Sequence, residues 1–171
     1  MKKMLIMVFL ALTVLSGCKT VDISNGATGS IPSSGLSQSS AFKGERGEFV
    51  AMGSDGVSVS VADVSDAKAH FFNTVLPNGK EIFFFVVKSS DGKLRAAANG
   101  CQVCGSAMQG FHQEGDFMVC NTCGNSYPLN KIATEKGGCN PAPISPDLKE
   151  SDGRVLITLA ELEGIQQFFY K

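Results

Sequence analysis

The sequence predicts a mostly β protein, in which a small antiparallel sheet domain carries a cysteine-rich, two-knuckle metal-binding segment and ends in a short helix. Three observations lead to this prediction. Asx-Gly pairs separate runs of β-branched and aromatic residues in the first half of the domain. Two Cys-x-x-Cys-Gly motifs, which are typical of metal knuckles, come next. A capping-box pattern for a helix follows them near the C-terminus.

The N-terminus has the pattern of an exported lipoprotein. Two lysines precede an apolar run at 4–15, which is shorter than the roughly 20 residues that a membrane-spanning helix needs. The tetrapeptide Leu15-Ser16-Gly17-Cys18 resembles a lipobox, in which the signal is cut before the cysteine and the thiol carries diacylglycerol. We therefore expect residues 1–17 to be a signal peptide and Cys18 to be the site of lipid attachment. The alternative is an ordinary secretory signal with Cys18 unmodified.

A flexible tether is expected to follow the lipidated cysteine. Residues 18–46 are rich in serine and glycine and show no sustained apolar period. The remaining chain, 47–171, is long enough for one β-rich metal-binding domain but not for two. We expect it to be lipid-anchored in the cell envelope and to face the periplasm or the exterior.

The charge of the chain argues against a nucleic-acid partner. The formal net charge is −1, and removal of Lys2 and Lys3 with the signal peptide lowers it to −3. A nucleic-acid binder needs a basic excess, which this chain lacks.

The strands are expected between glycine-containing turns. Hairpin turns are predicted at Asp55-Gly56, Asn78-Gly79 and Asp91-Gly92. Residues 57–61 alternate valine with serine, as in a strand that has one buried and one wet face. Residues 82–87 have no polar face, and their short length and β-rich content favour a strand over a buried helix. We predict that this strand is central and covered on both sides.

The amino-acid composition changes between Cys101 and Pro146, where cysteine, glycine, asparagine and proline dominate. With few large apolar residues, this segment is not expected to order itself without help, which a bound metal would supply. After it, residues 155–157 are expected to form a strand. Residues 158–161 have capping-box spacing for a short helix that ends near Gly164.

The strongest functional signal is the pair of motifs Cys101-Gln102-Val103-Cys104-Gly105 and Cys120-Asn121-Thr122-Cys123-Gly124, fifteen residues apart. Two residues between cysteines let one turn present both sulfurs to a single ion. The following glycine tolerates positive φ and lets backbone N–H groups approach sulfur. Two such knuckles predict a four-thiolate site for iron, zinc or an iron-sulfur cluster.

A fifth cysteine supports metal ligation over disulfide pairing. Once Cys18 carries lipid, five of the six cysteines remain, and an odd number cannot be fully paired in an oxidising compartment. Cys139 lies in Gly137-Gly138-Cys139-Asn140-Pro141, a loop that permits close backbone approach. We expect Cys139 to be a further ligand or a thiol near the centre, and the alternative is an exposed bystander.

Other soft or titratable side chains are weaker candidates. His112, together with Met108 and Met118, would suit a softer metal such as copper. We expect instead that His112 is a polar loop residue and that Met118, in the strand-like run 117–119, belongs to the core. His70 is expected to be a strand residue.

Two other functions remain open, besides a redox centre. The four thiolates would also suit a structural zinc site in a protein-interaction module. The Cys-x-x-Cys pairs would also suit thiol-disulfide exchange. The sequence has no nucleophile with a partnered base, no paired-carboxylate cleft and no phosphate-cradling loop, so a non-enzymatic redox or metal-binding protein is favoured over an enzyme.

Several motifs together resemble one known family. They are the run from Ile82 to Gly92, the first cysteine pair, Phe111-x-Gln113-x-Gly115, Met118-x-Cys120-x-x-Cys123-Gly124, and Gly137-Gly138-Cys139-Asn140-Pro141-x-Pro143. The chain is similar, over roughly 57–157, to the FtrD-like family of membrane iron-sulfur proteins.

The resemblance implies a cofactor, ligands and partners. It implies a cysteine-ligated iron-sulfur cluster or iron, carried by Cys101, Cys104, Cys120, Cys123 and Cys139. It also implies an association with iron-uptake membrane proteins. We therefore expect electron transfer or metal handling linked to iron uptake or respiration, with a membrane-embedded iron permease or a redox protein as partner. Several relatives are attached through transmembrane helices or fused to a permease, whereas this chain has a predicted lipid and tether.

Overall fold

The computed structural model describes residues 41–170, so the predicted signal peptide, Cys18 and residues 18–40 of the predicted tether lie outside the described residues. The described part is mostly β, as predicted, with one α-helix near its end. Its strands and helix are β1 (Glu48–Phe49), β2 (Gly56–Ser60), β3 (His70–Val75), β4 (Glu81–Lys88), β5 (Leu94–Cys101), β6 (Phe111–Glu114), β7 (Phe117–Cys120), β8 (Ser126–Pro128), β9 (Pro141–Ser145), β10 (Glu150–Ser151), β11 (Arg154–Thr158) and α1 (Leu159–Ile165). Short 3₁₀ turns are η1 (Ala62–Val64), η2 (Gly105–Ala107), η3 (Leu129–Lys131) and η4 (Gln166–Phe168).

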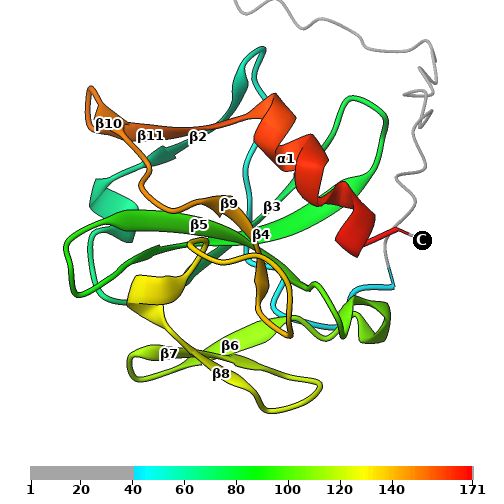
Figure 1. The fold of residues 1–171 in the computed structure, drawn as a ribbon. Helices are drawn as coiled ribbons and strands as arrows, with labels where there is room; N and C mark the ends of the chain where they lie inside the picture. Colours follow the sequence, from blue (N-terminus) through cyan, green and yellow to red (C-terminus); the bar gives the residue numbers. More distant parts are fainter. Residues whose placement is uncertain (1–40, 171) are drawn as a thin grey trace, which may run out of the picture. The chain divides into compact units, whose positions relative to one another are not determined.

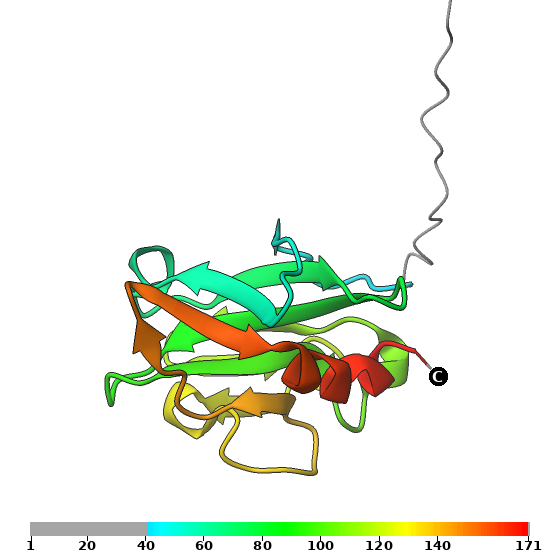
Figure 2. The same ribbon diagram turned by 90° about the horizontal axis from the view of Figure 1, so that it is seen from above.

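The strands form three sheets (Figure 1). The largest has the order β1-β3-β4-β5-β9, and the two smaller ones are β10-β11-β2 and β6-β7-β8. Neighbouring strands are antiparallel, as predicted, except that β1 runs parallel to β3. The large sheet lies between the two small sheets, and Figure 2 gives a second view of this arrangement.

Strand β4 is the middle strand of the large sheet, which confirms the prediction for residues 82–87. All six of these side chains are fully buried. The side chains of a strand alternate between its two faces, so a strand that is buried on both faces has no polar period. Phe84 therefore faces one core, whereas Phe85 faces another.

Two hydrophobic cores pack on the large sheet. The first core lies against β2, β11 and α1. It includes Phe42, Val57, Val59, Phe83, Phe84, Val155, Ile157, Leu162, Ile165 and Phe169. The second core lies against β6 and β7. It consists of Phe85, Val87, Ala97, Cys101, Phe111, Met118, Cys120, Leu129 and Ile132. The cysteine-rich segment thus contributes apolar side chains to a core of its own.

Two of the three predicted hairpin turns are confirmed and one is wrong. Asn78-Gly79 joins β3 to β4 and Asp91-Gly92 joins β4 to β5, with positive φ at both glycines. Asp55-Gly56 does not close a hairpin, because Gly56 is the first residue of β2 and β2 pairs with β11. A Cβ at Gly56 would lie 2.0 Å from the carbonyl oxygen of Ile157. The glycine there permits close approach of a strand, which a turn pattern cannot distinguish from a hairpin.

The first described residues pack on the large sheet. Phe42, which the sequence places in the predicted tether, is buried and stacks on Phe83 with ring centroids 4.1 Å apart. The side-chain amide of Asn73 donates hydrogen bonds to the carbonyl oxygens of Arg46 and Gly47. The last residues of the predicted tether, 42–46, are therefore part of the folded body.

The predicted C-terminal helix is confirmed as α1. The Thr158 hydroxyl accepts a hydrogen bond from the backbone N–H of Glu161, and the Glu161 carboxylate accepts one from the backbone N–H of Thr158. This capping box satisfies N–H groups that the first turn leaves unpaired. Leu162 and Ile165 then place the buried face of the helix in the first core.

Candidate metal centre

The cysteines come together where the ends of three strands meet. Cys101 is the last residue of β5, and it pairs with Pro141, the first residue of β9. Cys139 lies two residues before Pro141. Cys120 is the last residue of β7. Because strand ends are held by the sheets, the fold fixes the approach of three separate chain segments to one place.

All five predicted cysteines meet here, and Cys139 lies among the others. The sulfurs of Cys101, Cys104, Cys120 and Cys139 all lie within 4.8 Å of one another. The Cys139 sulfur is 3.3 Å from those of Cys101 and Cys104, and 2.7 Å from that of Cys123. None of the five thiols takes part in a disulfide within the described residues.

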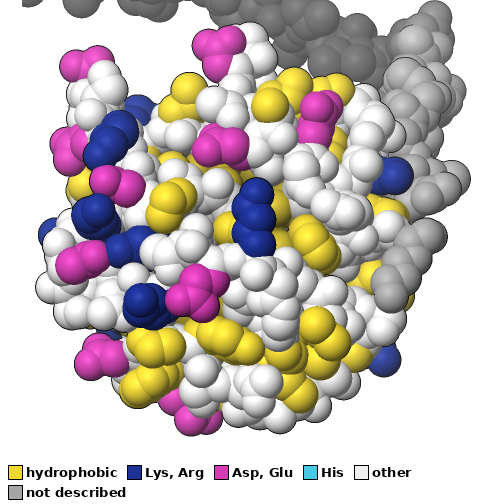
Figure 3. Space-filling model, in the orientation of Figure 1, with side chains coloured by type: hydrophobic (Ala, Val, Ile, Leu, Met, Phe, Trp, Pro, Cys, Tyr) yellow, Lys and Arg dark blue, Asp and Glu magenta, His cyan; other side chains and the backbone are white. Residues whose placement is uncertain are grey.

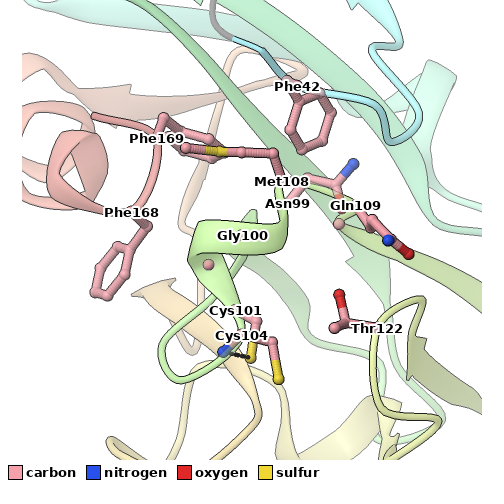
Figure 4. Close-up of a pocket in the computed structure, with 12 residues that line it drawn as sticks. Phe42, Asn99, Gly100, Cys101, Cys104, Met108, Gln109, Thr122, Phe168 and Phe169 are labelled. Carbon is pink, nitrogen blue, oxygen red and sulfur yellow. Dashed lines mark hydrogen bonds between the residues drawn. The ribbon is translucent and has the colours of Figure 1, made fainter. Parts of the chain in front are cut away.

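The first knuckle follows β5 directly. The backbone N–H of Cys104 donates a hydrogen bond to the Cys101 sulfur over 3.1 Å (Figure 4). Gly105 starts the short turn η2, and positive φ falls instead on Met108, at 55°. A Cβ on Gly105 would lie 3.3 Å from the carbonyl oxygen of Phe168. The expected use of this glycine for positive φ is therefore wrong, and it allows close approach of the C-terminal segment instead.

The second knuckle is the turn between β7 and β8. The backbone N–H of Cys120 donates to the carbonyl oxygen of Asn125, and the N–H of Gly124 donates to the carbonyl oxygen of Cys120. Gly124 has φ 75°, as its position in the motif predicts. This tight turn leaves Cys123 exposed, whereas Cys120 is buried.

The thiols differ in their readiness to ionise. A hydrogen bond with Cys139, aided by the backbone N–H of Asn125, lowers the pKa of Cys123 to about 7. The hydrogen bond between Cys104 and Cys139 lowers the pKa of Cys104, but loss of water and the charge of Cys101 outweigh it and raise this pKa to about 11. Burial raises the pKa of Cys139. Protons on these thiols compete with a bound cation, which would hold the sulfurs ionised.

The cysteine centre lies in a segment that matches a known protein family. The sequence model of the family described as membrane iron-sulfur containing protein FtrD-like matches residues 64–169. The chain belongs to this FtrD-like family. The matched region holds all five cysteines of the centre. No match was found among curated proteins or among solved structures.

The cysteines of this FtrD-like chain have the chemistry that an iron-sulfur protein requires. The donor set of five cysteine sulfurs suits iron, because thiolates are the ligands of iron-sulfur sites. The hydrogen bond that the backbone N–H of Cys104 donates to the Cys101 sulfur is of the kind that stabilises a ligating thiolate. The residues therefore fit a thiolate-bound iron. None of the helices within residues 41–170 combines the length and the apolar character needed to cross a membrane.

The weaker sequence candidates take other roles in the FtrD-like fold. His112 lies on β6, opposite Val119, so its assignment to a loop is wrong. Strand β6 has only four residues, so its alternation of side chains is too short to recognise in the sequence. Met118 is fully buried in the second core, as predicted, and Met108 packs against the first core. His70 is confirmed as a strand residue on β3.

Polar side chains around the cysteines escaped the sequence analysis. Gln102 and Asn140 join the first knuckle to the loop of Cys139. In the second knuckle, Asn121 donates from its side chain to the carbonyl oxygen of Gln109, and its side-chain oxygen faces the His112 ring. Their positions inside the motifs were visible in the sequence, but contacts between distant segments depend on the fold.

Proposed function

We propose that this FtrD-like protein is a lipid-anchored envelope protein that holds iron on cysteine thiolates and transfers electrons for iron uptake or respiration. The observation that carries the proposal is the convergence of five cysteine sulfurs from three strand ends. A set of free thiols in one place requires a cation, or protons on most of them, to limit repulsion between negative charges.

The position of the centre also suits electron transfer. Cys101 and Cys120 are buried, whereas Cys123 is exposed, so the centre extends from the second core to the surface. Val103, between the first two cysteines, is 65% exposed. Figure 3 shows further hydrophobic side chains at the surface in the lower part of the view, where β6, β7 and β8 lie. An apolar surface beside the centre would let a redox partner approach it closely.

The cysteines and their hydrogen bonds would have distinct tasks. Thiolates from the two knuckles and from the loop of Cys139 would hold the iron, which supplies a one-electron couple when bound. The N–H donated by Cys104 to the Cys101 sulfur would stabilise the reduced, more negative state of the centre. The second core would keep water from the buried side of the thiolates.

The test is anaerobic purification of the full chain with iron and sulfide counting and an absorption spectrum. The proposal predicts bound iron, a visible thiolate-to-iron absorption, and reversible bleaching of that band on reduction. A colourless protein that contains no iron after anaerobic handling and supply of iron would contradict the proposal.

The anchor and the partner form a separate part of the proposal. Cys18 would carry the lipid, and the partner would be a membrane-embedded iron permease or a redox protein. Cys18→Ala is expected to abolish labelling by palmitate and to release the protein from the membrane fraction. Cys139→Ala is the matched control, which should leave both unchanged. Persistent labelling of the Cys18 variant would contradict lipid attachment at this residue.

A structural zinc site is the second candidate. It is favoured by the meeting of β5, β7 and β9 at the cysteines, because an ion there would hold three segments together. Zinc on thiolates gives no visible absorption and no one-electron couple. The same purification therefore separates the two candidates through metal identity and colour.

A further inference from the structure

We propose that the centre binds a single ion through Cys101, Cys104, Cys120 and Cys139, that Gln102 positions Cys139 for this role, and that Cys123 stays outside the coordination sphere. The inference rests on the proposed binding of metal by the cysteines and names the ligands. It differs from the pairing that the sequence spacing predicts, in which the two complete knuckles supply the four sulfurs.

Five thiols compete for four positions. A thiolate-bound ion of this class takes four sulfurs at about 2.3 Å, which places neighbouring sulfurs about 3.8 Å apart. The Cys139 sulfur, at 3.3 Å from those of Cys101 and Cys104, needs to move by only about 0.5 Å to reach that spacing. The sulfurs of Cys123 and Cys139, at 2.7 Å, would have to separate by about 1.1 Å to share the ion.

The distances therefore select one of these two cysteines. Cys139 belongs to the group of four sulfurs that all lie within 4.8 Å of one another, and Cys123 does not. Cys139 is also partly buried, whereas Cys123 is exposed. Cys139 is the better placed fourth ligand on both grounds, because a buried thiolate gains more from pairing with a cation than a hydrated one does.

The loop of Cys139 is held in place by one side chain of the first knuckle. The Gln102 amide nitrogen donates to the side-chain oxygen of Asn140 over 2.9 Å, and the Gln102 amide oxygen accepts from the N–H of Gly137 over 2.9 Å. The two contacts bracket Cys139 in the sequence. Asn140 in turn donates from its side chain to the carbonyl oxygen of Glu135.

The side chain of Gln102 supplies two of the hydrogen bonds that join this loop to the first knuckle, and the backbone N–H of Gln102 adds a longer one, over 3.3 Å, to the carbonyl oxygen of Asn140. Gly137 and Gly138 both have positive φ, and a Cβ on either would meet nothing within 4 Å. Two such glycines leave the backbone free to move unless hydrogen bonds restrain it. Gln102, which lies between Cys101 and Cys104, therefore holds the loop of Cys139 against the first knuckle.

The compactness of the four sulfurs points to one ion. In a four-iron cluster each cysteine binds a different iron, and in a two-iron cluster the cysteines bind as one pair on each iron. Sulfurs on different irons are farther apart than the edge of a single tetrahedron. Four sulfurs within 4.8 Å of one another match the single tetrahedron instead. Iron on four thiolates in this form contains no inorganic sulfide.

The experiment uses the full chain, freed of metal, reduced, and loaded with Co²⁺ under anaerobic conditions. Cobalt reports thiolate ligation through its absorption, and iodoacetamide followed by peptide mass spectrometry reports which thiols stay free. We expect the thiolate absorption to saturate at one Co²⁺ per chain. We expect Cys123 to be alkylated as fast as in the metal-free protein, whereas the four ligands are protected.

The positioning role is tested with Gln102→Leu. Its matched control is Gln166→Leu, which removes another half-buried amide, one that accepts a 2.6 Å hydrogen bond from Asn78 in the turn between β3 and β4. We expect Gln102→Leu to weaken Co²⁺ binding by about 10- to 100-fold, as changes outside the ligand set do. Cys139 should also become alkylated in the cobalt-loaded variant, whereas the control should behave as the wild type does.

Each outcome bears on one part of the inference. Protection of Cys123, or exposure of Cys139, in the cobalt-loaded wild type would overturn the choice of ligands. Saturation at two Co²⁺, or acid-labile sulfide in the iron protein as isolated, would overturn the single ion. Continued protection of Cys139 in Gln102→Leu would overturn the positioning role. Absence of any thiolate-to-cobalt absorption in the wild type would instead refute the proposed function itself.

Discussion

Single residues near the centre differ in how their charges are stabilised. His112 has an acceptor at each ring nitrogen, the side-chain oxygen of Asn121 at 2.5 Å and the carboxylate of Glu114 at 2.8 Å. Only the doubly protonated ring can donate to both. The bond to Glu114, and then the bond to Asn121, raise the pKa of His112 above its ordinary value of 6.5. A protonated His112 therefore holds Asn121, a residue of the second knuckle.

This contact predicts a pH-dependent contribution to stability. Because the folded-state pKa of His112 is raised, its contribution is fully present below the ordinary pKa and is lost as pH rises through the raised value. His112→Gln is expected to lower the free energy of unfolding at about pH 5.5 and to have no effect at about pH 9. Urea unfolding at both values measures the difference. An equal effect at both values would show that the charge of the ring is irrelevant.

At the scale of elements, strand β4 supplies side chains to both cores. Phe84 and Phe85 are adjacent and both fully buried, yet Phe84 packs on Phe72 in the first core, whereas Phe85 shares the second core with Cys101 and Cys120. The same loss of volume on either side should cost similar stability. Its effect on the cysteines should differ.

This difference can be measured with two matched variants. Phe84→Ala and Phe85→Ala are each expected to lower the free energy of unfolding by about 3–5 kcal/mol. Only Phe85→Ala should also weaken Co²⁺ binding, because its cavity would loosen the packing of Cys101 and Cys120. Chemical unfolding and cobalt titration provide the two readings. Equal weakening of cobalt binding in both variants would mean that the cores do not separate the site from the rest of the sheet.

The capping box of α1 gives a second prediction at this scale. Thr158→Ala removes the oxygen that accepts from the N–H of Glu161 and is expected to cost about 1 kcal/mol. Thr158→Ser keeps that oxygen and should cost much less. Thermal unfolding distinguishes the two variants. If both lose the same stability, then the methyl group of Thr158 matters more than the cap.

The elements that the sequence predicts well are those with strong local signals. The uniform apolar run of β4, the Asn78-Gly79 and Asp91-Gly92 hairpins and the capping box of α1 were all predictable, because their causes lie within a few residues. The pairing of β2 with β11 was not predictable, because strands far apart in the sequence have no local signal for each other. The five cysteines were visible as a set. The arrangement of the other four cysteines around Cys139 depends on where β5 and β7 end and where β9 begins.

At the scale of the molecule, the cysteines join segments that have different support. β4 and its neighbours are held by two cores, whereas the chain from Cys101 to Pro141 has short strands and an open glycine loop. The second core, with Phe111, Met118 and Leu129, supplies part of its stability. An ion bound at the cysteines would supply more.

Metal removal is therefore expected to loosen one part of the folded body. On chelation, amide hydrogen exchange should become faster in 101–140, whereas the amides of β3 and β4 should keep their protection. Exchange measured by mass spectrometry on the reduced full chain, with and without metal, gives the comparison. Uniform acceleration across β4 would show that the ion stabilises the whole body. No change in 101–140 would show that the ion plays no structural part there.

The central claim is that the cysteine sulfurs bind one metal centre. X-ray absorption at the iron edge of the anaerobically purified full chain tests it most directly, because it reports the atoms bonded to the metal. We predict a first shell of sulfur alone, with four sulfurs at about 2.3 Å. A first shell of nitrogen and oxygen, or iron bound equally well after replacement of the cysteines of both knuckles and Cys139, would contradict it.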